Sequence, residues 1–274
     1  MNTISIISQI IGWIYWFAWS FSFYGQIYVN YKKKSVQGCK LDFVILNFTG
    51  FLFYSIYTTV GYFTDNPEKS GTGDVSIQDV VFAYHACILT IVTLLQTFIY
   101  PVKKKKLQIS YFLLIKRGNN QVNNITIFSI VSIWTFALTY GSLNGTVFQA
   151  NGKVSLVSFL GYFKVGITFF KYCPQVYWNY VRKCTEGWSI FNILMDATGA
   201  IFSFLQNVVD AIGQGKNPIS GGTLNVVKYA LSLISFLFDI IFIIQHYILY
   251  RKKTTQNNEQ ISLQQQLKQQ EVED

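Results

Sequence analysis

Seven apolar stretches of roughly 20 residues each account for most of this chain. A helix needs about that length to cross the hydrocarbon core of a bilayer. The chain has 274 residues, is 51% hydrophobic and only 13% charged, which is too apolar for an ordinary soluble domain. We therefore expect an all-α polytopic membrane protein with seven transmembrane helices, and we exclude a soluble enzyme. The stretches are residues 8–31, 42–63, 79–100, 125–143, 155–181, 188–209 and 224–249.

Clusters of basic residues predict the orientation of these helices. They follow the first, third, fifth and seventh stretches, so all of them lie on one side of the membrane. Because Lys and Arg mark the cytoplasmic side, we expect a lumenal N-terminus and a cytosolic C-terminus. The formal charge of +9 is then mainly a topology signal, and no nucleic-acid partner is expected. The clusters are Lys32–Lys34, Lys103–Lys106 with Lys116 and Arg117, Arg182 with Lys183, and Arg251–Lys253.

An internal repeat relates the two halves of the chain. Residues 26–50 align without a gap on residues 175–199, and eight of the 25 columns are identical. Repeats in a membrane protein usually build a site between two structural halves. The identical pairs are Gln26/Gln175, Tyr28/Tyr177, Asn30/Asn179, Tyr31/Tyr180, Lys34/Lys183, Gly38/Gly187, Thr49/Thr198 and Gly50/Gly199.

The fourth stretch has no counterpart in either repeat, so it is expected to link two units that face the same way. The predicted fold is a 3+1+3 arrangement of two parallel triple-helix bundles. The predicted divisions are a first three-helix repeat at 1–100, a cytosolic loop and linker helix at 101–150, a second three-helix repeat at 151–250 and a cytosolic tail at 251–274.

Two dipeptides occupy equivalent places in the repeats and are candidate hinges. Pro174-Gln175 lies inside the fifth stretch, where a proline removes a backbone hydrogen bond and kinks the helix. Gly25-Gln26 lies in the same columns of the first repeat, and glycine also loosens a helix. We expect bending at both places.

Several polar residues lie at membrane depth, where they are costly and indicate a functional site. Lys164, Lys171 and Gln175 are spaced by seven and four residues and share one helical face. Asp239 lies in the middle of the last stretch, and Asp79 opens the third. A purely structural network of ion pairs is the alternative explanation. Asn192 and Asp196 are four residues apart on one face of the sixth stretch, and Asn47 occupies the repeat column of Asp196.

The four cysteines predict neither a disulfide nor a metal site. Cys39, Cys87, Cys173 and Cys184 all fall in helices or cytosolic loops, and none has a spacing that suits zinc. We expect no cofactor.

The motifs Tyr24-Gly25-Gln26 and Cys173-Pro174-Gln175, with the seven-span layout, resemble those of the PQ-loop transporters. Longer strings, among them KYCPQVYWNY and TEGWSIFNILMDATGAIFSFLQ, are similar to the branch that exports L-cystine. The first motif departs from the family by carrying Gly25 in place of proline.

This resemblance implies proton-coupled export of L-cystine from a lysosome or vacuole to the cytosol by alternating access. It implies proton coupling at Asp196, Asp239 and Asp79. It implies substrate binding by Lys164, Lys171, Gln175, Asn179, Asn192, Asn47 and Asp196. Cystine carries two carboxylates and two ammonium groups, so a site that holds lysines together with acids and amides suits it chemically.

Two alternatives remain open at this point. Another amino acid or a sugar as substrate would keep the fold and change the cavity. A seven-helix receptor that transports nothing would keep the layout without the coupling.

Overall fold

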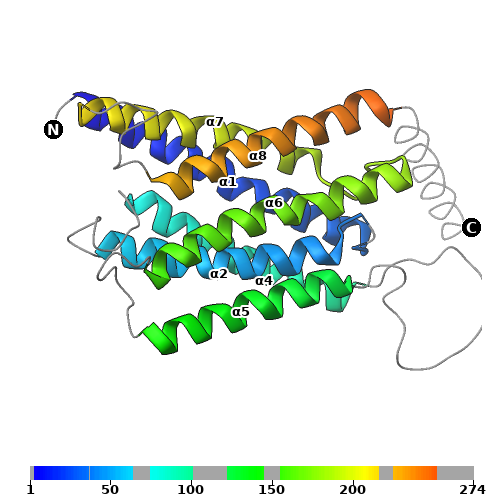
Figure 1. Cartoon of the computed structure of the whole chain (residues 1–274). Coiled ribbons are helices and arrows are strands. Elements are labelled where there is room, and N and C mark those ends of the chain that lie inside the picture. Colours follow the sequence, from blue (N-terminus) through cyan, green and yellow to red (C-terminus); the bar gives the residue numbers. More distant parts are fainter. Residues whose placement is uncertain are drawn as a thin grey trace, which may run out of the picture.

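The computed structural model describes residues 3–36, 38–63, 75–100, 122–144, 155–215 and 225–251, and this part of the chain forms seven long α-helices (Figure 1). Their positions match the seven predicted spans to within a few residues, so the predicted fold class is confirmed. Five of them, α1, α2, α4, α5 and α8, are long and apolar enough to cross a membrane by composition alone. The other two, α6 and α7, carry most of the predicted polar site. The helices are α1 (Thr3–Lys33), α2 (Leu41–Phe63), α4 (Ile77–Ile99), α5 (Asn124–Asn144), α6 (Leu156–Arg182), α7 (Ile190–Gly213) and α8 (Val226–Ile244), with a π-helical turn η1 (Gln245–Leu249) after α8.

Local sequence explains where several helices begin and end. Ser155 and Ser189 precede α6 and α7, and the hydroxyl oxygen of each accepts a backbone N–H from the first turn. Lys34 and Lys183 end α1 and α6 in the left-handed conformation, with φ of 45° and 50°. They form one of the identical pairs of the repeat. The repeat therefore extends to the backbone geometry of the helix ends.

The two three-helix units have the same internal order and interlock. In each unit the third helix packs against the other two, which gives α1–α4–α2 and α6–α8–α7. Between the units, the first helix of one packs against the second helix of the other, so α1 contacts α7 and α2 contacts α6. Figure 1 shows α5 beside α6 and α2, at the edge of the bundle. This arrangement is the 3+1+3 fold expected from the sequence.

Small residues let the interlocking helices approach closely. A Cβ atom on Gly12 of α1 would lie 2.5 Å from Gln206 of α7. The equivalent position in the second unit is Gly161 of α6, where a Cβ would lie 2.7 Å from Tyr57 of α2. Close helix contacts in membranes commonly depend on such small residues.

The connections between the first two helices of each unit cross at two glycines. A Cβ on Gly38 would lie 2.1 Å from the Cα of Gly187, which itself has a φ of 81°. Glycine adopts that conformation without a steric penalty. Since these residues occupy one repeat column, the pseudo-twofold axis passes between them.

Candidate functional site

A cavity of about 60 Å³, lined by polar and aromatic side chains, lies between the two three-helix units, with walls from α1, α2, α4, α6, α7 and α8. Ligand pockets usually hold roughly 300–1,000 Å³, so this cavity is smaller than a typical ligand pocket. Five predicted substrate residues meet in its wall, namely Asn47, Lys164, Lys171, Asn192 and Asp196. Three threonines and Gln26 add further polar groups, whereas Gln175 and Asn179 lie outside the wall.

Lys171 joins the two units across the cavity. Its Nζ donates to Oδ1 of Asn47 over 2.9 Å, and the side chain is buried. The ammonium also lies 4.5 Å from the ring centroid of Tyr172, within cation–π range. This cation therefore has one hydrogen bond and aromatic neighbours, and no carboxylate within ion-pair distance among the described residues.

Lys164 lies two turns along the same face of α6 and is also buried. Its Nζ is 3.5 Å from the ring centroid of Phe51, another residue of the cavity wall. Two ammonium groups thus approach one small cavity from α6. Such a pair is suited to bind a ligand with two carboxylates.

Asp196 faces both lysines from α7. Its Oδ2 accepts a hydrogen bond from the hydroxyl of Tyr172 over 2.6 Å. Its backbone carbonyl accepts one from Nε1 of Trp19 over 3.0 Å. The carboxylate is therefore held in place by α6 while it remains part of the cavity wall.

Asp239 is fully buried in α8, and its carboxyl group has no hydrogen-bond partner on either oxygen among the described residues. It interacts electrostatically with Asp196 and Lys171. Ser235, one turn before it, lines the cavity. A buried carboxyl without partners is unusual in a folded protein and points to a role for its charge state.

A layer of six amides closes the space between the cavity and the end of the bundle that carries Lys33 and Arg182, called the basic end here. In the first unit, Nε2 of Gln26 donates to Oδ1 of Asn30 over 2.9 Å. Nδ2 of Asn30 donates to Oε1 of Gln96, also over 2.9 Å. Nε2 of Gln96 then donates to the carbonyl of Ile27. We call Gln26, Asn30, Gln96 and their equivalents Gln175, Asn179 and Gln245 the glutamine layer.

The second unit repeats these contacts bond for bond. Gln175 donates to Asn179, Asn179 donates to Gln245, and Gln245 donates to the carbonyl of Val176, over 3.0–3.1 Å.

Each first glutamine of the layer also bonds to the connection of the other unit. Gln26 donates to the carbonyl of Gly187 and accepts from the backbone N–H of Ser189. Gln175 does the same with Gly38 and Lys40. The layer therefore holds the crossing connections together.

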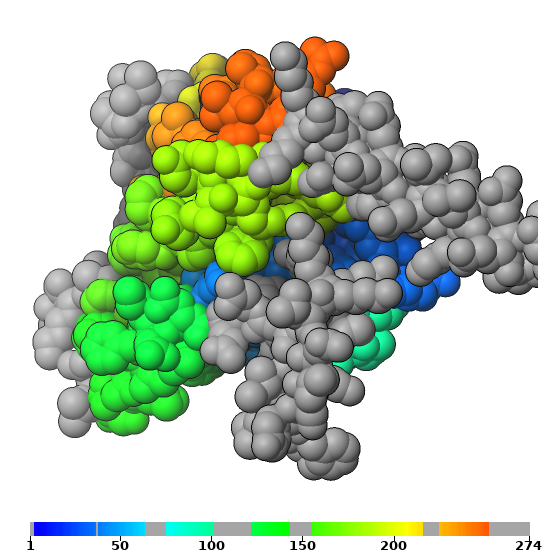
Figure 2. All heavy atoms as spheres, turned by 90° about the vertical axis from the view of Figure 1, so that its right-hand side faces the viewer, coloured from blue at the N-terminus to red at the C-terminus, as the bar shows by residue number. Residues whose placement is uncertain are grey.

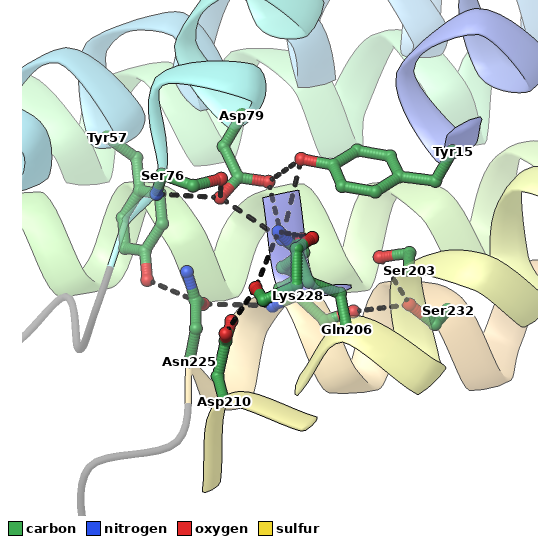
Figure 3. Close-up of polar contacts among 11 residues, drawn as sticks. Tyr15, Tyr57, Ser76, Asp79, Ser203, Gln206, Asp210, Asn225, Lys228 and Ser232 are labelled. Atoms are coloured by element: carbon green, nitrogen blue, oxygen red, sulfur yellow. Dashed lines mark hydrogen bonds and ion pairs between the residues drawn. The ribbon is translucent and has the colours of Figure 1, made fainter. Parts of the chain in front are cut away.

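A second polar layer lies on the other side of the cavity and contains a buried ion pair (Figure 3). Nζ of Lys228 lies 3.1 Å from Oδ1 of Asp79, and both side chains are almost fully buried. The hydroxyl of Tyr15 donates to Asp79 over 2.5 Å, and Lys228 donates to Oε1 of Gln206 over 2.5 Å. These four residues, called the ion-pair layer here, join α1, α4, α7 and α8. Asp79 thus lies outside the cavity wall and holds this layer together.

Sequence reasoning missed Gln96, Gln245, Lys228 and Tyr15. The signal was available in the offset of the repeat, since 175 − 26 = 149 and both 96 + 149 = 245 and 79 + 149 = 228. Gln96 and Gln245 therefore occupy one column, and Asp79 and Lys228 occupy another. Both columns lie beyond the aligned segment, which ends at Gly50 and Gly199.

The hinge candidates lie close to the glutamine layer. Pro174 is inside α6, directly before Gln175. At the equivalent place in α1, a Cβ on Gly25 would lie 2.7 Å from Oγ of Ser189, so glycine allows α1 to approach the start of α7.

The described residues contain no cluster of His, Cys, Asp and Glu that could hold a metal ion.

Comparisons with known proteins agree with this arrangement. The family model for the PQ loop repeat matches residues 7–66 and 156–212, one segment in each unit. A cystinosin homolog from Dictyostelium discoideum is 39% identical over 259 residues, which cover 92% of this chain and 84% of the relative. Cystinosin from Bos taurus is 36% identical over 262 residues, and the chain spans 65% of its length. A cystine transporter from Saccharomyces cerevisiae is 26% identical over 257 residues, 90% of this chain and 95% of the relative.

Proposed function

This chain belongs to the cystinosin group of the PQ-loop family, and we propose that it exports L-cystine together with protons from an acidic organelle, a lysosome or vacuole, to the cytosol. The observation that carries the proposal is the cavity between the two units, whose wall holds Lys164 and Lys171 together with Asp196. The name of the yeast relative, a cystine transporter, supports the same substrate.

The charges of the cavity suit cystine. The two lysines supply cations for its two carboxylates, and Asp196 supplies an anion for one ammonium group. Asn47 and Asn192 supply amide oxygens for the other. A sugar would leave the two lysines without anionic partners, which costs free energy at this depth. A ligand with carboxylates therefore fits better than a sugar.

The two polar layers suggest how access alternates. With the basic end in the cytosol, the glutamine layer closes the cytosolic side and the ion-pair layer closes the lumenal side. Opening either side requires breaking one layer while the other persists. Pro174 and Gly25 adjoin the glutamine layer and are placed to act as its hinges.

Protons would couple to this cycle through the buried acids. Protonation of Asp79 removes the negative charge that faces Lys228, which weakens the lumenal layer and favours a lumen-open state. Asp239 is buried without a hydrogen-bond partner among the described residues, and the charges of Asp196 and Lys171 act on it. Release of substrate changes those surroundings, and this links the proton on Asp239 to occupancy of the cavity.

The test is uptake of labelled L-cystine into proteoliposomes, with and without a proton gradient directed along the substrate flux. We expect uptake that is faster with the gradient and is competed by unlabelled cystine but not by glucose. Asp239→Asn, which keeps the shape and removes the charge, should transport cystine without moving protons. Equal uptake in protein-free liposomes would overturn the transport proposal. Gradient-independent uptake by the unaltered protein would overturn proton coupling alone.

A further inference from the structure

A second cavity, an apolar groove of about 850 Å³, lies on the side of α6 that faces away from the substrate cavity. Its walls come from α2, α5 and α6. The apolar side chains include Leu46 on α2, Phe128 and Ile133 on α5, and Ile167 and Phe170 on α6. Figure 2 shows α5 in green beneath α6 in yellow-green, seen from the basic end. A groove of this kind within a membrane faces the lipid.

The mouth of the groove at the basic end is polar and nearly neutral in charge. Lys40 and Asp42, at the start of α2, approach to 3.7 Å, and Trp178 of α6 lies beside them with its ring centroid 4.9 Å from Nζ of Lys40. Two polar atoms here are buried without a hydrogen-bond partner in the described part of the chain, Nε1 of Trp178 and Oδ2 of Asp42. One is a donor and the other an anionic acceptor, so the mouth suits a ligand that carries both charges.

We propose that this groove binds one zwitterionic glycerophospholipid, with an acyl chain between α5 and α6 and the headgroup at Lys40, Asp42 and Trp178. Lys40 and the indole N–H would meet the phosphate, and Oδ2 of Asp42 would meet the ammonium. Indole rings favour this depth of a bilayer because they are amphipathic. An apolar helix of a second copy would leave the indole N–H without an acceptor.

The groove and the substrate cavity lie on opposite faces of α6, so a lipid in the groove would contact the helix that carries the substrate lysines. Pro174 lines the groove, as does Cys173, while Lys171 and Lys164 extend from the other face of the same helix. A bound acyl chain would therefore contact α6 beside Pro174, behind the substrate lysines. The binding itself does not depend on the proposed transport function.

Gly166 offers a sharp test, because it lines the groove and a Cβ added there would meet no atom within 4 Å. Gly166→Leu therefore projects a side chain into the groove from a position where the Cβ has room, and a helix interior favours leucine over glycine. The control is Thr135→Leu, which places the same leucine side chain at an exposed position of α5 outside the groove. Both variants should keep the gel-filtration profile of the unaltered protein.

The full chain is reconstituted with a trace of phosphatidylethanolamine that carries a photoreactive diazirine in one acyl chain. After irradiation, the labelled residues are mapped by mass spectrometry. We expect the label to concentrate on the groove-facing residues of α5 and α6. Gly166→Leu should reduce it about tenfold, equivalent to the loss of roughly two buried CH₂ groups, while Thr135→Leu leaves it unchanged.

Other outcomes decide against the proposal or part of it. Equal labelling of Gly166→Leu and the unaltered protein, or an even spread of label over all lipid-facing helices, would overturn the site. A cross-link between two protein copies at the groove would assign it to a second copy instead. A photoreactive diacylglycerol that labels as strongly as the phospholipid, or a stronger signal from phosphatidylglycerol, would overturn the headgroup assignment. Trp178→Phe should narrow the difference in labelling between the phospholipid and the diacylglycerol, since it removes the indole N–H and keeps an aromatic ring.

Discussion

At the level of single residues, Lys171 is a side chain of the second unit that forms a hydrogen bond to the first unit across the cavity. It extends from α6, bonds to Asn47 of α2 and interacts with Asp239 of α8. Both members of the repeat column Asn47/Asp196 lie in the wall of the same cavity. The repeat predicted a functional role for this polar pair. Their shared place in the cavity wall gives a physical reason for two polar residues in one column.

Lys171→Met should weaken substrate binding while preserving the length of the side chain. A hydrogen bond to a charged group contributes about 1.5–3 kcal/mol, so KM for cystine should rise about tenfold or more. Initial rates of uptake into proteoliposomes measure this, and Lys32→Met, at an exposed position of α1, is the control. An unchanged KM would remove Lys171 from the substrate site.

Cys39 should be an unreactive thiol in the folded protein. It lies in the connection between α1 and α2, and burial raises its pKa from the ordinary value of 9.0 to about 12. Because the thiolate is the nucleophile, N-ethylmaleimide should leave Cys39 unmodified at pH 7 and modify it after unfolding. Peptide mass mapping gives the readout. Rapid modification of the folded protein would contradict the burial of this connection.

The same thiol makes stability depend on alkaline pH. The pKa of the thiol is higher in the folded state than in the unfolded state. Its contribution to the free energy of unfolding is therefore fully present below pH 9 and is lost as pH rises from 9 towards about 12. The thermal midpoint of Cys39→Ala should consequently fall less steeply over that pH range than the midpoint of the unaltered protein. Parallel declines would indicate that other groups govern alkaline unfolding.

At the level of elements, the glutamine layer fixes the ends of four helices at once. Gln96 and Gln245 extend from the third helix of each unit and complete the hydrogen bonds of Asn30 and Asn179. The two copies differ in one respect, since α4 remains α-helical through Gln96 whereas Gln245 begins a π-helical turn. Single π turns often occur at functional sites.

Gln96→Ala and Gln245→Ala should each lower stability by about 1–3 kcal/mol, because each removes the acceptor of a buried amide N–H, that of Asn30 or of Asn179. Their equivalence in the repeat predicts similar losses, measured as shifts of the thermal midpoint in detergent. Gln9→Ala, at an exposed position of α1, should have little effect. A large loss for one substitution and none for the other would contradict the equivalence of the two copies.

At the level of the whole molecule, the two units are related by a pseudo-twofold axis that passes between Gly38 and Gly187. Asp79 and Lys228 occupy one repeat column, so their ion pair lies across this axis. An acid in one copy and a base in the other make the column attractive, where two identical charges would repel each other. The two repeats therefore differ in charge at the ion-pair layer, which lies on the side of the cavity away from the basic end.

Exchanging the pair tests this interpretation. Asp79→Lys or Lys228→Asp alone leaves like charges buried together, and we expect a loss of at least about 3–5 kcal/mol, the usual cost of breaking a buried pair. The double exchange restores opposite charges and should recover much of the stability. Recovery will be incomplete, because Asp79 also accepts hydrogen bonds from Tyr15 and Ser76. The stabilities of the three variants are compared by thermal unfolding. A double variant whose loss of stability equals the sum of the two single losses would contradict a pairwise interaction.

By itself, the sequence determined the number of helices, their approximate ends and the existence of two related units. These features follow from local patterns, since a membrane helix satisfies its own backbone and needs only a long apolar stretch. The position of the α6 lysines at the cavity was also predictable, because buried charge is conspicuous in such a stretch, whereas the hinges at Pro174 and Gly25 stay a prediction.

Only the tertiary structure decided which polar residues meet. Gln175 and Asn179 share the face of α6 with Lys171, yet they lie in the glutamine layer, whereas Asn47 reaches the cavity from a helix more than a hundred residues away. Contacts of that kind depend on how α1 packs against α7 and α2 against α6, and helix periodicity contains no information on the partner. The ion pair of Asp79 with Lys228 and the groove behind α6 are decided in the same way, by the packing of helices that are distant in the sequence.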